Sequence, residues 1–379
     1  MAKVGRILAA TALTLIGIAV LAAFGSRTNA NDFVEYWSAG KLFVHGANPY
    51  SGPLILALEK SRGFTPDAPL IMLNPPWALP MVAPLGFLPA LSALVLWIVA
   101  GAGCILASLF LLDIPAKNHT LAFLFAPVLG CFAMEQSSPF LLLGLSLFLR
   151  FHRNRPFLAG AALLLMAIKP HLFMIFWVIL LADCLYRRRF AILAGFASSL
   201  AGVSMLVTLV RPHVWQDYFA LVRESTLDQN SYPTLSSLLR AMIDVNRAWI
   251  ATIPLCMAIV WGIAYYWRRR SRWDWKREGM LVIMVAVLTS PYCWISDEVV
   301  LLPSVVFGLT PPRRRYSAEI LAAINLAGVA GICITIRSLA WLPLAFFLWY
   351  LYATWSMTNV RFEGEKFETT VSDDAAFSG

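Results

Sequence analysis

Residues 90–112 read ALSALVLWIVAGAGCILASLFLL, a stretch that contains no charged side chain. An α-helix needs about 20 mainly apolar residues to cross the hydrocarbon core of a bilayer, so this stretch predicts a transmembrane helix. Similar runs fill most of the 379-residue chain, which is 59% hydrophobic and only 13% charged. A soluble globular protein is about 25% charged, because its surface faces water. The composition therefore predicts an integral membrane protein.

Further candidate spans are apolar runs bounded by charges or by proline. They lie at 7–24, 120–134, 139–150, 157–168, 172–186, 190–210, 248–267, 279–290, 298–309, 317–335 and 339–357. Together with 90–112 they predict an all-α, polytopic transmembrane helical bundle of about ten to twelve spans. We expect one integral-membrane domain over residues 1–357, followed by a polar cytoplasmic tail at 358–379 that is disordered.

Several of these runs are too short for a full span and come in pairs, each pair split by a polar motif. The motifs are Glu135-Gln136 within 120–150, Lys169-Pro170 within 157–186 and Ser290-Pro291 within 279–309. Two interpretations are open. Either the helices stop inside a water-filled cavity, where irregular backbone is tolerated, or some pairs are single long helices.

Basic residues gather in short clusters that fall on every second loop. These clusters lie at residues 3–6, 117, 150–155, 187–189, 268–277 and 313–315. By the positive-inside rule these loops are cytoplasmic. The net charge of +9 is thus explained by topology and gives no reason to expect a nucleic-acid partner. We expect a multi-pass protein of the bacterial inner (plasma) membrane in contact with the lipid bilayer, whose first apolar run is retained although it resembles a signal peptide.

The two long loops on the opposite face, 25–89 and 211–247, mix aromatic and charged residues. This mixture suits interfacial helices that lie on the membrane. We therefore expect these external loops to carry such helices.

Polar residues beside apolar runs are candidates for function, because they are expensive to place near a bilayer. On the external side they are Asp32, Glu35, Glu135, Gln136, Lys169, His171, Arg223, Arg240, Asp297 and Glu298. Such a set would place carboxylates opposite cations at the rim of an apolar cavity. Glycosyl transfer from a lipid phosphate needs that combination. A carboxylate removes the proton of the acceptor hydroxyl, and cations stabilise the departing phosphate.

Most of these residues also have an ordinary structural explanation. Lys169 is placed where a lysine snorkels from a helix end. Asp297 and Glu298 begin an apolar run, where an acid caps a helix and interacts with its dipole. Arg223 and Arg240 suit contacts with lipid head groups. The sequence leaves both explanations open for each.

An ordered set of short motifs resembles glycosyltransferase family 87. The set comprises Asp32 after the first span, Tyr36-x-x-Ala39, Gly46-x-x-Pro49-Tyr50, the proline-rich stretch 75–89, Glu135-Gln136, Lys169-Pro170 and Ser290-Pro291-x-x-Trp294. The similarity runs from about residue 30 to residue 305. That family contains polyprenol-phosphate-mannose-dependent mannosyltransferases, so the resemblance implies a bundle of the C type (GT-C).

The resemblance implies that Asp32 is the general base of an inverting transfer on the external face, and that Lys169 and residues 290–298 lie near the donor. The remaining assignments are Glu35 and Asp297 as supporting acids, His171, Arg223 and Arg240 beside Lys169 as ligands of the donor phosphate, and Glu135, Gln136 and Trp294 as cavity lining. We assign no metal site and no cofactor.

Two positions depart from the family pattern. Glu135 stands where the family usually has glycine. Where many members carry histidine after Trp294, this chain has Ser296-Asp297. If that histidine contacts the phosphate, another cation replaces it here, or Asp297 has a different role.

These observations predict a membrane hexosyltransferase that moves a hexose such as mannose. The donor is a polyprenyl-phosphate sugar, and the acceptor is a lipid-linked or cell-envelope glycan or glycolipid. One alternative is a secondary transporter, which also places broken helices and buried charges at a central site. The absence of a sequence repeat and the two long outer loops speak against it. The other alternative is a non-enzymatic membrane component of an envelope polysaccharide pathway.

Overall fold

The computed structural model describes residues 32–64, 66–224, 234–244, 246–311, 313–334 and 339–355. The predicted first span at 7–24 and the polar tail at 358–379 lie outside these residues. Every regular element in the described part is helical, which confirms the predicted all-α transmembrane bundle.

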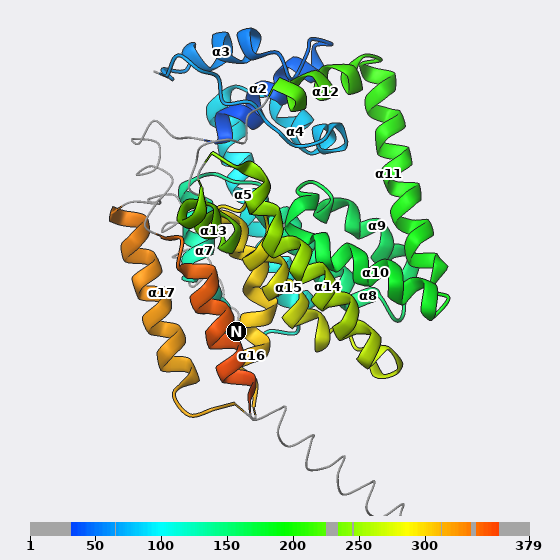
Figure 1. Cartoon of the computed structure of the whole chain (residues 1–379). Helices are drawn as coiled ribbons and strands as arrows, with labels where there is room; N and C mark the ends of the chain where they lie inside the picture. The colour runs from blue at the N-terminus through cyan, green and yellow to red at the C-terminus, as the bar shows by residue number, and fades with distance from the viewer. Residues whose placement is uncertain are drawn as a thin grey trace, which may run out of the picture.

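Four of the described helices are long and apolar enough to cross a membrane. They are α5 (Ala90–Leu111), α11 (Phe190–Val210), α14 (Thr252–Arg269) and α17 (Ser317–Ile334) (Figure 1). Their outer faces expose large apolar side chains such as Leu91, Leu209 and Leu326. Lipid tails are as apolar as leucine, so these exposed faces suit a bilayer.

Shorter helices complete the bundle. They are α6 (His119–Phe123), α7 (Ala126–Ala133), α8 (Ser138–Phe151), α9 (Pro156–Met166), α10 (Met174–Tyr186), α15 (Glu278–Thr289), α16 (Leu302–Leu309) and a helix over Leu342–Trp355. Each of the three polar motifs separates two of these helices, at η3 (Pro170–Phe173), at η6 (Ile295–Leu301) and at the turn before α8. The helices therefore stop at the motifs, and the alternative of single long helices is wrong.

The predicted span at 120–134 is divided into α6 and α7, which the sequence analysis did not foresee. Pro127 stands in the first turn of α7, and the ring of a proline disfavours a helical residue before it. Asn325 of α17 satisfies the backbone groups that the break leaves free. Its Oδ1 accepts from the Ala126 N–H at 2.6 Å, and its Nδ2 donates to the Leu124 carbonyl at 2.9 Å.

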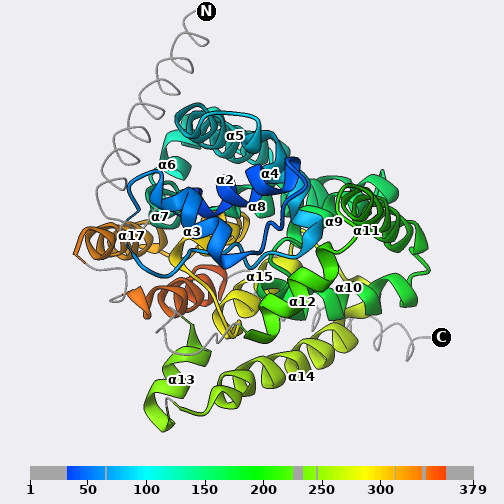
Figure 2. The same cartoon turned by 90° about the horizontal axis from the view of Figure 1, so that it is seen from above.

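Helices in the two long loops cover one end of the bundle, as predicted. The first loop holds α2 (Phe33–Val44), α3 (Gly52–Lys60), η1 (Pro76–Ala78) and α4 (Leu79–Gly86), and the second holds α12 (Val214–Glu224) and α13 (Leu235–Ile243). Seen from above, α2, α3 and α4 lie across the bundle (Figure 2). We call this the α2 end.

Helix α2 packs tightly on α4, because glycine stands on both sides of the contact. A Cβ atom at Gly40 would lie 2.2 Å from the Val82 carbonyl oxygen, and one at Gly86 would lie 2.4 Å from the Gly40 carbonyl oxygen. The two backbones therefore touch, and this contact fixes the helix that begins just after Asp32.

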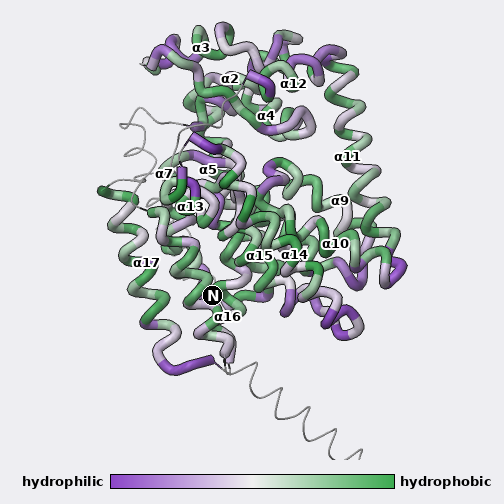
Figure 3. The backbone as a smooth tube through the Cα atoms, in the orientation of Figure 1, coloured by the Kyte–Doolittle hydropathy of each residue, from purple (hydrophilic) through white to green (hydrophobic). Residues whose placement is uncertain are grey.

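The opposite end carries four of the basic clusters, at residues 150–155, 187–189, 268–277 and 313–315, and we call it the basic end. Two contacts join the clusters. Arg153 forms an ion pair with Asp274 at 2.9 Å, and Arg187 Nη2 donates to the Arg270 carbonyl at 2.7 Å. Hydrophilic residues gather at the two ends, with apolar residues between them (Figure 3). Three short 3-10 segments, η2 (Ala116–Asn118), η4 (Ala248–Ala251) and η5 (Arg270–Arg272), lie between the helices.

Candidate active site

Gln136, in the turn between α7 and α8, connects the acid of α2 with a buried lysine. Its Nε2 donates to Asp32 Oδ2 at 2.5 Å. Its Oε1 accepts from Lys169 Nζ at 2.8 Å and from the Tyr36 hydroxyl at 2.9 Å. One uncharged amide therefore holds a carboxylate and an ammonium group at a fixed spacing.

Lys169 continues the same network to Asp297 of η6. Its Nζ lies 2.7 Å from Asp297 Oδ1, and the two side chains are only 8% and 0% exposed. Ser138 donates to the same oxygen at 2.6 Å, and the Trp294 N–H donates to Oδ2 at 3.0 Å. Asp297 therefore both caps the start of η6 and supplies the counter-charge of Lys169. We call Asp32, Tyr36, Gln136, Ser138, Lys169 and Asp297 the site network.

Residues of the first long loop secure the break before Lys169. Trp77 Nε1 donates to the Ala167 carbonyl at 2.9 Å, and Asn74 Nδ2 donates to the Ile168 carbonyl at 3.0 Å. The last carbonyls of a helix lack partners within the helix, and inside a bilayer each unsatisfied one costs several kcal/mol. These two side chains allow α9 to end inside the bundle and so place Lys169 there.

Glu135 has a left-handed backbone, with φ of 56°. That conformation costs a residue with a Cβ about 1–2 kcal/mol, whereas glycine adopts it freely. The left-handed backbone at Glu135 therefore explains why glycine is the usual residue of the family pattern at this position. Trp97 donates its indole N–H to the Glu135 carbonyl at 2.7 Å and holds the turn.

Asp32, which directly precedes α2, and Glu35, in the first turn of α2, differ in their electrostatics. Helix α2 lies outside the four long spans, and both side chains are half-buried. Burial raises the pKa of Asp32 to about 6, although the Gln136 hydrogen bond and the Lys169 charge oppose this rise. Burial, and then the neighbouring Asp32 charge, raises the pKa of Glu35 to about 8. At neutral pH Glu35 therefore keeps its proton while Asp32 carries the charge, which is the division of roles that a general base needs.

His171, Trp294 and Glu298 surround the segment that carries Asp297. The ring of half-buried His171 lies 5.2 Å from that of Tyr292, and Trp294 Nε1 donates to the Tyr292 hydroxyl at 2.7 Å. Glu298 is fully buried, and neither of its carboxylate oxygens has a hydrogen-bond partner among the described residues. These three residues therefore lie beside the site network, and Trp294 joins it through its backbone N–H, which donates to Asp297.

The structure does not bring the two predicted arginines into the site network. Arg223 is exposed in the last turn of α12. Arg240 is half-buried on α13, which is tied to the end of α15 by a 3.1 Å hydrogen bond from Ser236 to the Thr289 carbonyl. Of the predicted phosphate ligands, only Lys169 belongs to the site network.

Several residues that form contacts in the site were not predicted individually from the sequence. Some of them belong to short motifs of the sequence, but no individual contact was predicted for Tyr36, Asn74, Trp77, Trp97 or Ser138. Their partners lie up to 159 positions away in the chain, so no local pattern indicates the pairing. Within the described ranges, no group of three or more His, Cys, Asp or Glu residues is arranged to hold a metal ion.

Comparison with known proteins gives one match. The sequence model of a family described as Glycosyltransferase family 87 matches residues 73–291. The match contains Gln136 and Lys169 but neither Asp32 nor Asp297, so it is narrower than the predicted range of similarity. No curated protein and no solved structure matches the chain.

Proposed function

We propose that this chain, which belongs to glycosyltransferase family 87 and is a membrane glycosyltransferase, transfers a hexose such as mannose from a polyprenyl-phosphate donor. The acceptor is a lipid-linked or cell-envelope glycan or glycolipid on the periplasmic side of the bacterial inner membrane. One observation carries the proposal: the hydrogen-bonded chain from Asp32 through Gln136 to Lys169. It supplies a base and a cation at fixed spacing next to apolar helices, which glycosyl transfer from a lipid phosphate requires.

Asp32 acts as the general base. The acceptor hydroxyl attacks the anomeric carbon, and its proton passes to the Asp32 carboxylate as the new bond forms. Gln136 holds one carboxylate oxygen, so the other is available to the acceptor. The bond between the anomeric carbon and the phosphate oxygen breaks on the opposite side, which inverts the configuration of that carbon.

Lys169 stabilises the departing phosphate. An ammonium group has three N–H donors, of which two bind Gln136 and Asp297. The third serves the phosphate oxygen on which negative charge grows in the transition state. Asp297 keeps the ammonium group charged and oriented in apolar surroundings.

A panel of donors tests the proposal. Purified protein in proteoliposomes is given radiolabelled polyprenyl-phosphate sugars or the corresponding nucleotide sugars, together with extracted envelope lipids as acceptors. We expect labelled glycolipid and free polyprenyl phosphate from one hexose of the polyprenyl series, and no product from the nucleotide sugars. Transfer from a nucleotide sugar alone would overturn the donor class. Uptake of a solute without any transfer would indicate the transporter alternative.

A further inference from the structure

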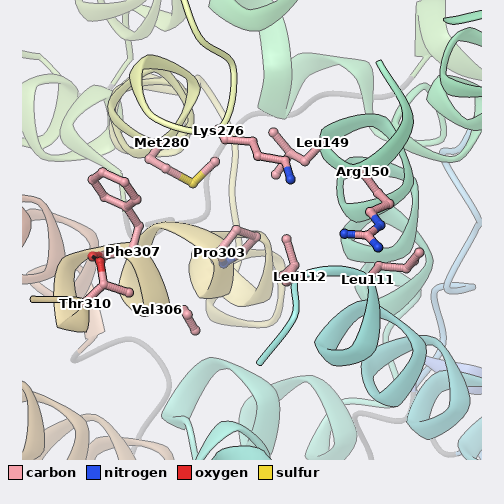
Figure 4. Close-up of a pocket in the computed structure, with 10 residues that line it drawn as sticks. All are labelled: Leu111, Leu112, Leu149, Arg150, Lys276, Met280, Pro303, Val306, Phe307 and Thr310. Carbon is pink, nitrogen blue, oxygen red and sulfur yellow. Dashed lines mark hydrogen bonds between the residues drawn. The ribbon is translucent and has the colours of Figure 1, made fainter. Parts of the chain in front are cut away.

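A cavity of about 260 Å³ lies at the basic end of the bundle, away from the α2 end and its site network (Figure 4). The last turns of α5 and α8, the segment that leads into α15, and α16 form its walls. The cavity has no role in the proposed transfer reaction.

Two cations face this cavity from different elements. Arg150 comes from the last turn of α8, and Lys276 comes from the segment before α15. Both side chains line the cavity (Figure 4). One N–H of Arg150 binds Asp113 at 2.7 Å, which leaves further guanidinium donors.

Neither of the two acids nearest to Lys276 in sequence, Asp274 and Glu278, forms an ion pair with it. Glu278 lies 3.8 Å from Arg269 and accepts the Tyr265 hydroxyl. The Asp274 carboxylate pairs with Arg153 at 2.9 Å and accepts the Lys276 backbone N–H at 3.1 Å. Among the described residues, the Lys276 ammonium group has no ion pair and no hydrogen bond. Arg150 and Lys276 line the cavity and no acid in the described part of the chain does, so the cavity has an excess of positive charge.

Apart from Thr310, the remaining wall is apolar. Leu112, Met280, Pro303 and Phe307 line it, and Met280 and Pro303 are buried. Cations beside an apolar wall suit an amphiphile with an anionic head, whereas a free anion would leave the apolar wall unused. The cavity also lies at the ends of apolar helices, which is where the head groups of a bilayer lie.

We propose that this cavity binds the phosphate head of an anionic phospholipid from the adjoining leaflet. Arg150 and Lys276 contact the phosphate, and the glycerol and the first part of an acyl chain lie along Met280, Pro303 and Phe307. Basic pockets between transmembrane helices are known to bind anionic head groups. This inference does not depend on the proposed transfer reaction.

Native mass spectrometry of the full chain, titrated with phosphatidylglycerol, tests this site. We expect the Lys276→Gln variant to bind phosphatidylglycerol about fivefold more weakly, and Lys276→Gln combined with Arg150→Gln about tenfold or more, since each cation near an anionic lipid contributes at about this level. Lys117→Gln is the matched control, because Lys117 is an exposed cation of η2 that does not line the cavity. It should bind as the unaltered protein does.

Two further measurements make the result decisive. Phosphatidylcholine, which has no net charge, should bind the unaltered protein much more weakly than phosphatidylglycerol. Millimolar inorganic phosphate should fail to displace bound phosphatidylglycerol, because it lacks the apolar part. Equal binding of the two lipids, displacement by inorganic phosphate, or unchanged affinity in the Lys276→Gln variant would each overturn the proposal.

Discussion

At the residue scale, Gln136 explains how Asp32 and Lys169 share one small site without forming a direct ion pair. A direct ion pair between Asp32 and Lys169 would neutralise both groups. The amide instead donates to Asp32 and accepts from Lys169. Asp297, and not Asp32, forms the direct ion pair with Lys169. In the proposed function, this arrangement leaves the Asp32 carboxylate available to the acceptor.

The raised pKa of Asp32 gives a pH prediction. Burial places this pKa at about 6, and the base works only when it has lost its proton. We therefore expect kcat/KM for transfer to rise about tenfold per pH unit below pH 6 and to level off above it. A pH profile in proteoliposomes measures this. A flat profile between about pH 5 and about pH 7 would show that no group with the pKa of Asp32 limits the reaction.

The ion pair of Lys169 and Asp297 gives a second prediction. Lys169→Met leaves the Asp297 carboxylate buried without its counter-charge, which typically costs about 3–5 kcal/mol of stability. It also removes a charge contact to the phosphate, so transfer should fall about a hundredfold. Thermal unfolding and a transfer assay of the inserted protein measure the two effects separately.

The double variant Lys169→Met with Asp297→Asn separates the effect on stability from the effect on transfer. It removes the unpaired buried charge, so the unfolding temperature should recover much of the loss. Transfer should stay low, because the cation is still absent. Recovery of both stability and transfer would limit Lys169 to a structural role.

At the element scale, the helix breaks build the site. Helices α7, α9 and α15 each end beside a polar motif, and side chains from elsewhere satisfy the backbone groups that the ends leave free. Prolines and charged residues mark these breaks in the sequence, so their positions could be predicted. The side chains that satisfy them, such as Asn74 for the end of α9, depend on tertiary structure and could not. The break before α7, which Asn325 satisfies, was itself not predicted.

The contact between α2 and α4 gives a third prediction. Gly40→Ala would place a Cβ atom 2.2 Å from the Val82 carbonyl oxygen, so α2 must shift. Overpacking of this kind costs about 1–3 kcal/mol, and displacement of a catalytic group by about 1 Å can cost about a hundredfold in rate. We expect a lower unfolding temperature and much slower transfer.

Gly103→Ala on α5 is the matched control for Gly40→Ala. Its added methyl group meets no atom within 4 Å, and alanine favours a helix more than glycine does. This control should keep its stability and its activity. If Gly40→Ala behaves in the same way, the close packing of α2 on α4 does not position Asp32.

At the scale of the whole molecule, the two ends differ in character, and this difference predicts the orientation in the membrane. Four basic clusters meet at the basic end, and the helices of the long loops lie at the α2 end. A reporter fused after Arg189, Arg272 or Arg315 should read cytoplasmic, and one inserted near Ser61 should read external. An external signal at Arg272 would contradict the positive-inside assignment.

The sequence predicted the large features of the molecule better than its site. A helix that faces lipid must be apolar along its whole length, so α5 and α11 could be located within a residue or two. The polar motifs could also be located, because charged residues are rare near lipid and are easily recognised within apolar sequence. The role of Asp297 as partner of Lys169 could not be predicted, because 128 positions separate the two residues.

The proposed mechanism depends on Asp32 as the general base, and the Asp32→Asn variant is its sharpest test. Asparagine keeps the shape of the side chain but cannot take up the proton. Glu35→Gln is the matched control, because a pKa of about 8 leaves Glu35 protonated at neutral pH and glutamine resembles that form. The measurement is the transfer rate of each inserted variant, with donor binding determined in parallel. We expect at least a roughly hundredfold loss of transfer for Asp32→Asn, within the usual range for a general base. Donor binding should stay near normal, and Glu35→Gln should lose much less. Normal transfer by Asp32→Asn, with Glu35→Gln or Asp297→Asn inactive, would contradict the proposed mechanism.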